Sequence, residues 1–249
     1  MIYPPLDAPA VADLSGRILY EDNHLLVFNK RAGEIVQGDK TGDTPLSETL
    51  KAFIAQRDGK PGQVFLGVPH RLDRPVSGIC LFAKTSKCLE RLAEAFRTGS
   101  VHKIYWALAT ARPEPDAGEL VHYLVRNERQ NKSYPFPTPQ EALRAAGRNG
   151  VSGGTGAVKE ARLRYRTVRA TERYFLVEVE LLTGRHHQIR CQLSAIGCPI
   201  RGDLKYGAPR SNRDGSISLH ARSLSLIHPV RKEPLDFTAP VNWPPILAD

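Results

Sequence analysis

The feature that most constrains the fold is a change of hydrophobic period between residues 86 and 109. Over 86–97 the apolar side chains recur at helical spacing, which predicts a helix with Ser86 as its cap and Gly99 just beyond its end. Residues 101–109 then alternate, which predicts a strand. We take its apolar face to be Ile104, Trp106 and Leu108, and its opposite face to be Lys103, Tyr105 and Ala107.

The same two periods predict further elements along the chain. They are strands at 17–20 and 25–30 joined as a hairpin, a helix at 46–56, a strand at 79–83, a second hairpin from 161–168 and 174–182, and a helix at 186–195. Residues 1–16 lack periodicity and are expected to be an extended arm, and 127–157 a mobile basic loop or insertion. Residues 17–240 would then be one domain, followed by a tail at 241–249.

The charge and the cysteines limit the class of protein. A formal net charge of +9 favours polyanionic partners, with nucleic acid ahead of anionic membrane because no long apolar segment could span a bilayer. The cysteines have no CxxC spacing, and the N-terminus does not resemble a signal peptide. We therefore expect a cytoplasmic protein with reduced, buried thiols. These are Cys80, Cys88, Cys191 and Cys198.

The run at 70–78, His-Arg-Leu-Asp-Arg-Pro-Val-Ser-Gly, is the first candidate site. It places Asp73 between Arg71 and Arg74, and a carboxylate beside permanent cations stays ionised. Such a group can serve as a nucleophile or a base rather than as a proton donor. Taken alone, the run is equally compatible with a solvated surface turn. His70 is expected to be structural.

The second polar cluster runs from Thr183 to Arg190, where an apolar strand gives way to a helix. Backbone N–H groups at a helix start, together with Arg185 and two histidines, favour an anion or phosphate site. A metal site is the weaker interpretation, because adjacent histidines on a helix point in different directions and no HExxH pattern is present. Neither a phosphate loop, a GxSxG elbow nor a dinucleotide fingerprint occurs in the chain.

Taken together, these motifs resemble the RluA-type family of RNA pseudouridine synthases. The resemblance rests on the run at 70–78 and on segments in the family's order, namely 18–30, 103–107, 159–161, 183–190, 202–203 with 206–207, and 219–221 with 228–229. It implies an α+β fold, with a long, mixed but mostly antiparallel sheet, flanking helices and loops, and a central RNA-binding catalytic cleft. It also implies isomerisation of specific uridines in rRNA or tRNA by a monomer, with no cofactor, no metal and no obligatory protein partner.

Carried over residue by residue, the resemblance implies that Asp73 is the catalytic aspartate. Tyr105 would stack on the base and is a candidate to take the carbon 5 proton. Arg190 would pair with Asp73, with Arg185 as second choice. Arg71 would fill the space of the flipped uridine. Further substrate contacts are expected from Arg74, Lys103, Arg185 and His187.

Two departures from the family pattern are visible. Val76 stands where threonine is common, and Cys191-Gln192 replaces a more usual Val-His. Neither removes charge from the expected site. The alternative to a synthase is a catalytically silent RNA-binding protein or RNA chaperone on the same fold, and a metal-dependent hydrolase is the third interpretation.

Overall fold

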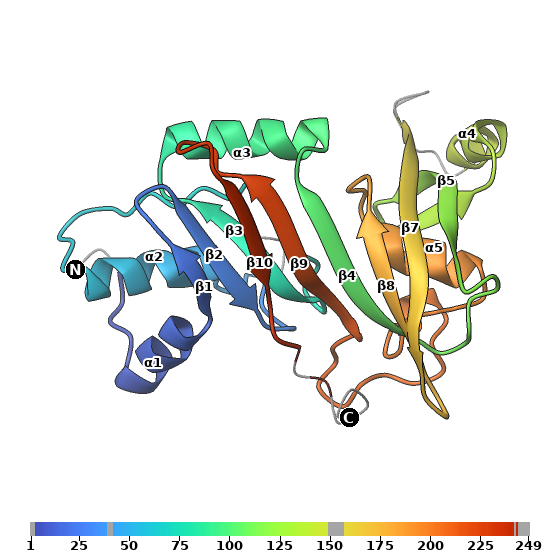
Figure 1. Ribbon diagram of the computed structural model, residues 1–249, viewed down its shortest axis with the longest axis horizontal. Helices are drawn as coiled ribbons and strands as arrows, with labels where there is room; N and C mark the ends of the chain where they lie inside the picture. Colours follow the sequence, from blue (N-terminus) through green and yellow to red (C-terminus); the bar gives the residue numbers. More distant parts are fainter. Residues whose placement is uncertain (1–2, 39–41, 149–156, 242, 244–249) are drawn as a thin grey trace. The chain divides into compact units, whose positions relative to one another are not determined.

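A computed structural model describes residues 3–38, 42–148, 157–241 and 243 (Figure 1). Within them the strands form a ten-stranded, mostly antiparallel sheet in the order β1-β2-β3-β9-β4-β8-β7-β5-β6, with β10 paired to β9. This confirms the predicted α+β fold. The chain divides into two compact units, a first unit of residues 1–101 with 221–241 and a second unit of 102–220 with 242–249. The predicted catalytic domain, 17–240, therefore includes parts of both.

The first unit contains three helices and five strands among its described residues. In chain order they are α1 (Ala8–Gly16), β1 (Ile18–Glu21), β2 (Leu25–Lys30), α2 (Leu46–Arg57), β3 (Ser77–Ala83), α3 (Ser86–Thr98), β9 (Leu219–Ile227) and β10 (Pro234–Thr238). The hairpin β1–β2 and the helices α2 and α3 confirm the predictions. The cap of α3 lies one residue earlier than expected, because the Thr85 hydroxyl accepts from Cys88 N. Gly99 ends α3 with φ +75°.

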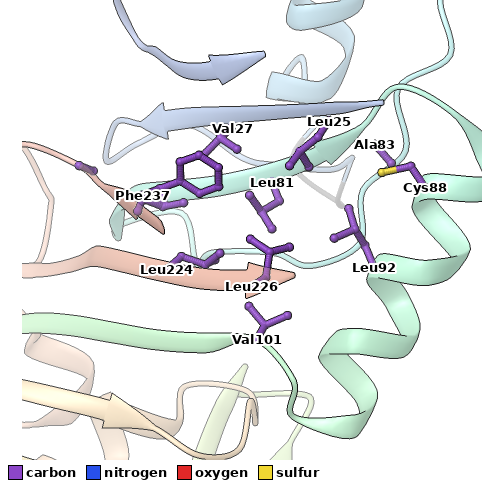
Figure 2. Close-up of a cluster of buried hydrophobic side chains, with 12 residues drawn as sticks. Leu25, Val27, Leu81, Ala83, Cys88, Leu92, Val101, Leu224, Leu226 and Phe237 are labelled. Carbon is purple, nitrogen blue, oxygen red and sulfur yellow. The ribbon is translucent and has the colours of Figure 1, made fainter. Parts of the chain in front are cut away.

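The core of the first unit lies between α3 and the strands beside it (Figure 2). Leu92 and Cys88 point from α3 toward Leu81 of β3, and Leu226 of β9 closes the cluster. Leu81 and Leu92 are fully buried. Burial of each such leucine contributes about 2 kcal/mol, so this layer holds β3 firmly in place. Because the Asp73 run leads directly into β3, the core also fixes the position at which this run ends.

The expected extended arm at 1–16 is wrong for residues 8–16, which form α1. The Asp7 carboxylate caps this helix by accepting from Ala10 N at 2.8 Å. Proline suggested an irregular segment, yet Pro9 lies in the first turn, where a missing N–H costs nothing. Leu14 is buried and attaches α1 to the first unit.

The second unit is built on the antiparallel order β4-β8-β7-β5-β6. Its elements are β4 (His102–Ala109), β5 (Ala117–Asn127), β6 (Lys132–Phe136), α4 (Pro139–Arg148), β7 (Val158–Ala170), β8 (Phe175–Leu181), α5 (Gln188–Ala195) and the short 3-10 helix Leu204–Tyr206. The β7–β8 hairpin confirms the prediction for 161–182.

The prediction of a mobile loop at 127–157 is wrong over 132–148, which form β6 and α4. The prolines misled, because Pro135 lies in the terminal strand of the sheet order and Pro139 is the first residue of a helix, and both positions tolerate proline. Ala142 and Ala146 of α4 are buried against Val125. Residues 149–156 lie outside the described part of the chain.

The apolar face predicted for β4 is confirmed at Leu108, which is buried, but not at Trp106. Trp106 lies opposite Glu178, to which its indole N–H donates at 3.3 Å, so it is on the charged face of the sheet. Tyr105 lies opposite Val179, which is completely buried. The alternation of apolar residues therefore did not predict which side chains of β4 are buried, because a large apolar side chain can also lie on a charged face of a sheet.

Among the described residues, the helices are too short or too polar to span a membrane.

Candidate active-site residues

Asp73 lies in the first unit, in a short turn just before β3. Its side chain is half-buried, and its backbone oxygen accepts from Val76 N at 3.0 Å. Leu72 and Val76, on either side, are buried and anchor the turn in the core. The carboxylate is thus presented by a turn whose flanking side chains are fixed.

Lys30, a buried lysine for which the sequence predicted no role, binds the backbone of this turn. Lys30, at the end of β2, is only 1% exposed. Its ammonium donates to four backbone oxygens, those of Val76 at 2.6 Å, Arg31 at 2.9 Å, Arg74 at 3.2 Å and Asp73 at 3.3 Å. Burial lowers the pKa of Lys30 to about 8, although the Asp73 charge opposes that shift. In the sequence, Lys30 is visible only as the polar residue that ends the apolar run 25–30.

Two further contacts fix the entry into β3. Gly78 has φ +111°, and a Cβ there would lie 2.4 Å from Ala221 O, so the position requires glycine. His70 accepts from Leu81 N at 2.9 Å through Nε2, and its ring stacks on Phe96 with a centroid distance of 4.4 Å. The structural role predicted for His70 is confirmed.

The two arginines beside Asp73 have different surroundings. Arg71 is exposed, as a side chain that enters a nucleic-acid duplex needs to be. Arg74 is also exposed, but its guanidinium pairs with Asp43 at 2.8 Å and donates to Gly33 O at 3.1 Å. Arg74 therefore ties Gly33 and Asp43 to the Asp73 turn.

In the second unit, the cluster at 183–190 leads into α5 through a turn. The helix begins two residues later than predicted because His187 has a left-handed backbone, with φ +54°. The Gln188 side chain accepts from the Thr183 hydroxyl at 2.8 Å and from Arg185 N at 3.0 Å. Arg185 is exposed and donates to Glu160 O at 2.9 Å.

Arg190 is buried in α5 and forms a bidentate pair with Asp203. Its Nε donates to Oδ2 at 2.7 Å and its Nη2 to Oδ1 at 2.9 Å, and Asp203 is 1% exposed. The guanidinium also lies over the Tyr206 ring, 5.1 Å from the centroid. Both partners fell within segments used for the resemblance, but their pairing was missed because it joins positions thirteen residues apart across a turn.

His187 is buried beside the same tyrosine. Its Nδ1 lies 2.9 Å from the Tyr206 hydroxyl, and its ring stacks on His186. Burial, reinforced by Arg190, lowers the pKa of His187 to about 2, so the ring is neutral at physiological pH. These contacts give His187 a structural role inside the second unit, and its contact with RNA stays a prediction. In the described residues no group of three or more His, Cys, Asp or Glu side chains could hold a metal ion.

Lys103 and Tyr105 lie on the same face of β4 and are half-buried. Burial lowers the pKa of Lys103.

The four cysteines are free and buried, as expected, and burial raises the pKa of Cys80 to about 12. A thiol so resistant to ionisation is a core residue rather than a nucleophile.

Comparison with known proteins identifies the family to which this chain belongs. The sequence profile of the RNA pseudouridylate synthase family matches residues 24–195. The ribosomal large subunit pseudouridine synthase C of Vibrio vulnificus is 31% identical over 238 residues, covering 93% of this chain and 68% of that protein. The tRNA pseudouridine synthase C of Salmonella typhi is 33% identical and covers 92% and 88%.

The fold agrees with these relatives. The solved structure of human RNA Pseudouridylate Synthase Domain Containing 4 has a TM-score of 0.72 and 25% identity, covering 93% of this chain and 91% of that chain. The chain belongs to the RluA-type family of RNA pseudouridine synthases. This confirms the resemblance inferred from the motifs.

In this RluA-type chain the expected catalytic groups come from both units. Asp73 and Arg71 belong to the first unit, whereas Lys103, Tyr105 and Arg190 belong to the second. The expected pairing of Arg190 with Asp73 therefore joins the two units and stays a prediction. Within its own unit, Arg190 is held by Asp203 through Nε and Nη2, and the remaining nitrogen, Nη1, carries two further protons.

Proposed function

We propose that this chain isomerises specific uridines of rRNA or tRNA to pseudouridine, with Asp73 as the catalytic group. The family membership supports the reaction, and the named activities of the two relatives above support rRNA and tRNA as alternative substrates. The reaction breaks the bond between ribose and uracil N1, rotates the base and rejoins it through carbon 5. It needs one ionised carboxylate and an extruded base, and neither a cofactor nor a metal.

Four of the predicted site residues have a defined part in this proposal. Asp73 is the ionised carboxylate, and Arg190 holds it in that state through a charge-assisted hydrogen bond. Tyr105 stacks on the uracil, and Arg71 fills the space that the uridine leaves. Exposure of Arg71 and burial of Arg190 support these two different roles.

The observation that carries the proposal is the anchoring of the Asp73 turn by Lys30. A buried ammonium is costly, and such a group is retained where fixed geometry matters. Three of its four backbone acceptors, those of Asp73, Arg74 and Val76, lie within the Asp73 turn. A solvated surface turn would need no such support, so the anchoring favours a functional role for the run at 70–78.

The test is release of tritium from RNA that carries tritium at uracil carbon 5. Wild-type protein should release it from bulk unmodified tRNA or rRNA, and Asp73→Asn should release none while it binds RNA as before. Asp116→Asn is the matched control, because Asp116 is paired with an arginine, Arg112 at 2.6 Å, as we propose for Asp73, but lies at the surface. Turnover by Asp73→Asn, or no release by the wild type, would refute the proposal.

We propose further that the enzyme works as a cytoplasmic monomer with no obligatory protein partner. A monomer can flip and isomerise a base only if one chain supplies every site residue, and all the residues named above come from this chain. Light scattering during size-exclusion chromatography should give the mass of a single chain at concentrations that support turnover. A dimer mass under those conditions would contradict this part of the proposal.

A further inference from the structure

The hairpin between β5 and β6 is a well-defined feature of the second unit. Asn127 pairs with Lys132, and residues 128–131 form the turn. Gln130 N donates to the Asn127 side chain at 3.0 Å, and Asn131 takes up a left-handed backbone with φ +46°. The tip of the hairpin is thus shaped by its own side chains.

The hairpin is fastened to the segment that leads into α5. The His186 ring lies 3.1 Å from Asn131 Oδ1 through Nε2 and 2.9 Å from the Ser133 hydroxyl through Nδ1. The Tyr206 hydroxyl accepts from Ser133 N at 2.9 Å. Lys205 donates to Asn131 O at 3.0 Å and to Gln130 O at 3.3 Å. A hairpin held at β6 and at its tip keeps one position relative to α5.

This hairpin carries positive charge that is not paired with carboxylates among the described residues. Arg126 and Arg129 are exposed and Lys132 is half-buried. None of these three forms an ion pair with any carboxylate in the part of the chain that the structure describes. Glu128 is the only acid in the segment 126–136, so three cations and one carboxylate leave a formal charge of +2.

Three arginines of β7, unlike the hairpin cations, are paired with carboxylates. Arg162, Arg164 and Arg166 are exposed, but each is paired with a glutamate on the same face, at 3.0, 3.2 and 2.7 Å. A row of satisfied pairs offers little net field to an anion. The hairpin cations therefore differ from these three arginines, whose charge is neutralised by neighbouring glutamates.

The hairpin charge also lies close to Arg190. Lys132 Nζ and the Arg190 guanidinium each lie 5.1 Å from the centroid of the Tyr206 ring. Arg126 and Lys205 both contribute to the lowered pKa of His187, after burial and Arg190. A polyanion that reaches Arg190 would therefore meet the hairpin as well.

We propose that the β5–β6 hairpin binds the RNA backbone, with Arg126, Arg129 and Lys132 contacting phosphates close to the target uridine. The proposal rests on the proposed function, because the ligand is the same RNA. The three cations act without regard to sequence, since phosphate contacts carry no sequence information. His186 is a positioning residue that keeps them in place.

The experiment compares two variants with equal change in charge. Arg126→Gln/Arg129→Gln/Lys132→Gln removes the hairpin cations, and Arg112→Gln/Arg164→Gln/Arg166→Gln removes three paired surface arginines. Both lower the formal net charge from +9 to +6, since 9 − 3 = 6. The probe is a fluorescein-labelled RNA stem-loop, and Kd is measured by anisotropy between 50 and 200 mM salt, about the range over which phosphate contacts dominate.

The hairpin variant should bind on the order of a hundredfold more weakly near 150 mM salt, with the slope of log K against log salt reduced by about two to three. The control should change Kd less than threefold, within about the ordinary effect of exposed pairs. In tritium release the hairpin variant should raise KM and keep kcat, because these contacts are equal in ground and transition states.

Equal slopes for the two variants would overturn the inference. Thermal unfolding checks folding, and Arg126→Gln/Arg129→Gln is the second variant, since it keeps the Lys132 contact with Tyr206 and alters only exposed side chains. It should still reduce the slope by about one to two. Wild-type tritium release tests the proposed function separately, so an active wild type with an unaffected hairpin variant refutes this inference alone.

Discussion

Replacement of Lys30 by methionine tests whether a buried ammonium organises the Asp73 turn. Methionine fills a similar volume and removes the charge and all the hydrogen bonds to the four backbone oxygens. Asp73 O keeps its bond from Val76 N and Arg74 O its bond from Gly33 N, but Val76 O and Arg31 O lose the lysine, at about 1–3 kcal/mol for each buried oxygen left without a partner. The variant therefore loses several kcal/mol of favourable contacts around Asp73.

Part of that loss is offset, because the ammonium itself is costly to bury. A pKa of about 8 instead of 10.5 means that the native state disfavours the charged form by roughly 3 kcal/mol. The free energy of unfolding at pH 7 should thus fall by only about 1–3 kcal/mol, whereas turnover should fall at least tenfold because Asp73 is no longer held. Urea unfolding and tritium release measure the two quantities. An unchanged kcat in a folded variant would refute the reasoning.

The pH dependence gives a second check on Lys30. Because the native pKa is lowered, the unfolded chain binds more protons between about pH 8 and 10.5, so the Lys30 contribution to stability rises with pH over that window. Turnover should change in the opposite direction above about pH 8, because a neutral amine has fewer protons to donate to the turn. The difference between wild type and Lys30→Met isolates this residue, and a difference that is flat from pH 7 to 10 would contradict the assignment.

Three further substitutions follow from the contacts described. Arg190→Lys keeps the charge but loses the bidentate pair with Asp203, and should cost about 3 kcal/mol in urea unfolding and abolish most tritium release; a stability within 1 kcal/mol of wild type, about the cost of a surface pair, would argue against that pair. Gly78→Ala should destabilise by roughly 3 kcal/mol or more, whereas the control Gly99→Ala, with open space around its Cβ, should cost only about 1–2 kcal/mol; equal costs would contradict the close approach to β9. Thr85→Ala removes the cap of α3 and should lower the free energy of unfolding by about 0.5–2 kcal/mol, and no change would show that this cap bond is not formed in solution.

The parts of the fold that the sequence predicted are those that depend on local physics. Helix α3 has both its apolar period and its terminal glycine within one short segment, and the β1–β2 hairpin has its turn residues between two apolar runs. The Asp73 run was recognised for the same reason, since its residues are adjacent in the chain. Short-range patterns of this kind need no knowledge of which distant segment packs against them.

The parts that were missed depend on distant partners. Lys30 resembled the polar end of a strand, because only the folded chain brings the backbone of residues 73–76 to its ammonium. Trp106 resembled a core residue, because the glutamate on β8 that its indole contacts lies 72 positions away. Pro135 resembled a loop residue, because only the sheet order shows that its strand is the terminal one. In each case tertiary context overrode local preference.

Each unit thus prepares one of the expected catalytic partners with a buried group of its own. Lys30 holds the turn of Asp73 in the first unit, and Asp203 holds Arg190 in the second. Because Lys30 and Asp203 share no hydrogen-bond partner among the residues that the structure describes, Lys30→Met and Asp203→Asn should have additive effects on the free energy of unfolding, within about 0.5 kcal/mol. Their effects on turnover should instead be far from additive, since an aspartate and an arginine that act as one pair lose their function when either is displaced. A double variant whose loss of activity equals the product of the single losses would show that Asp73 and Arg190 act independently.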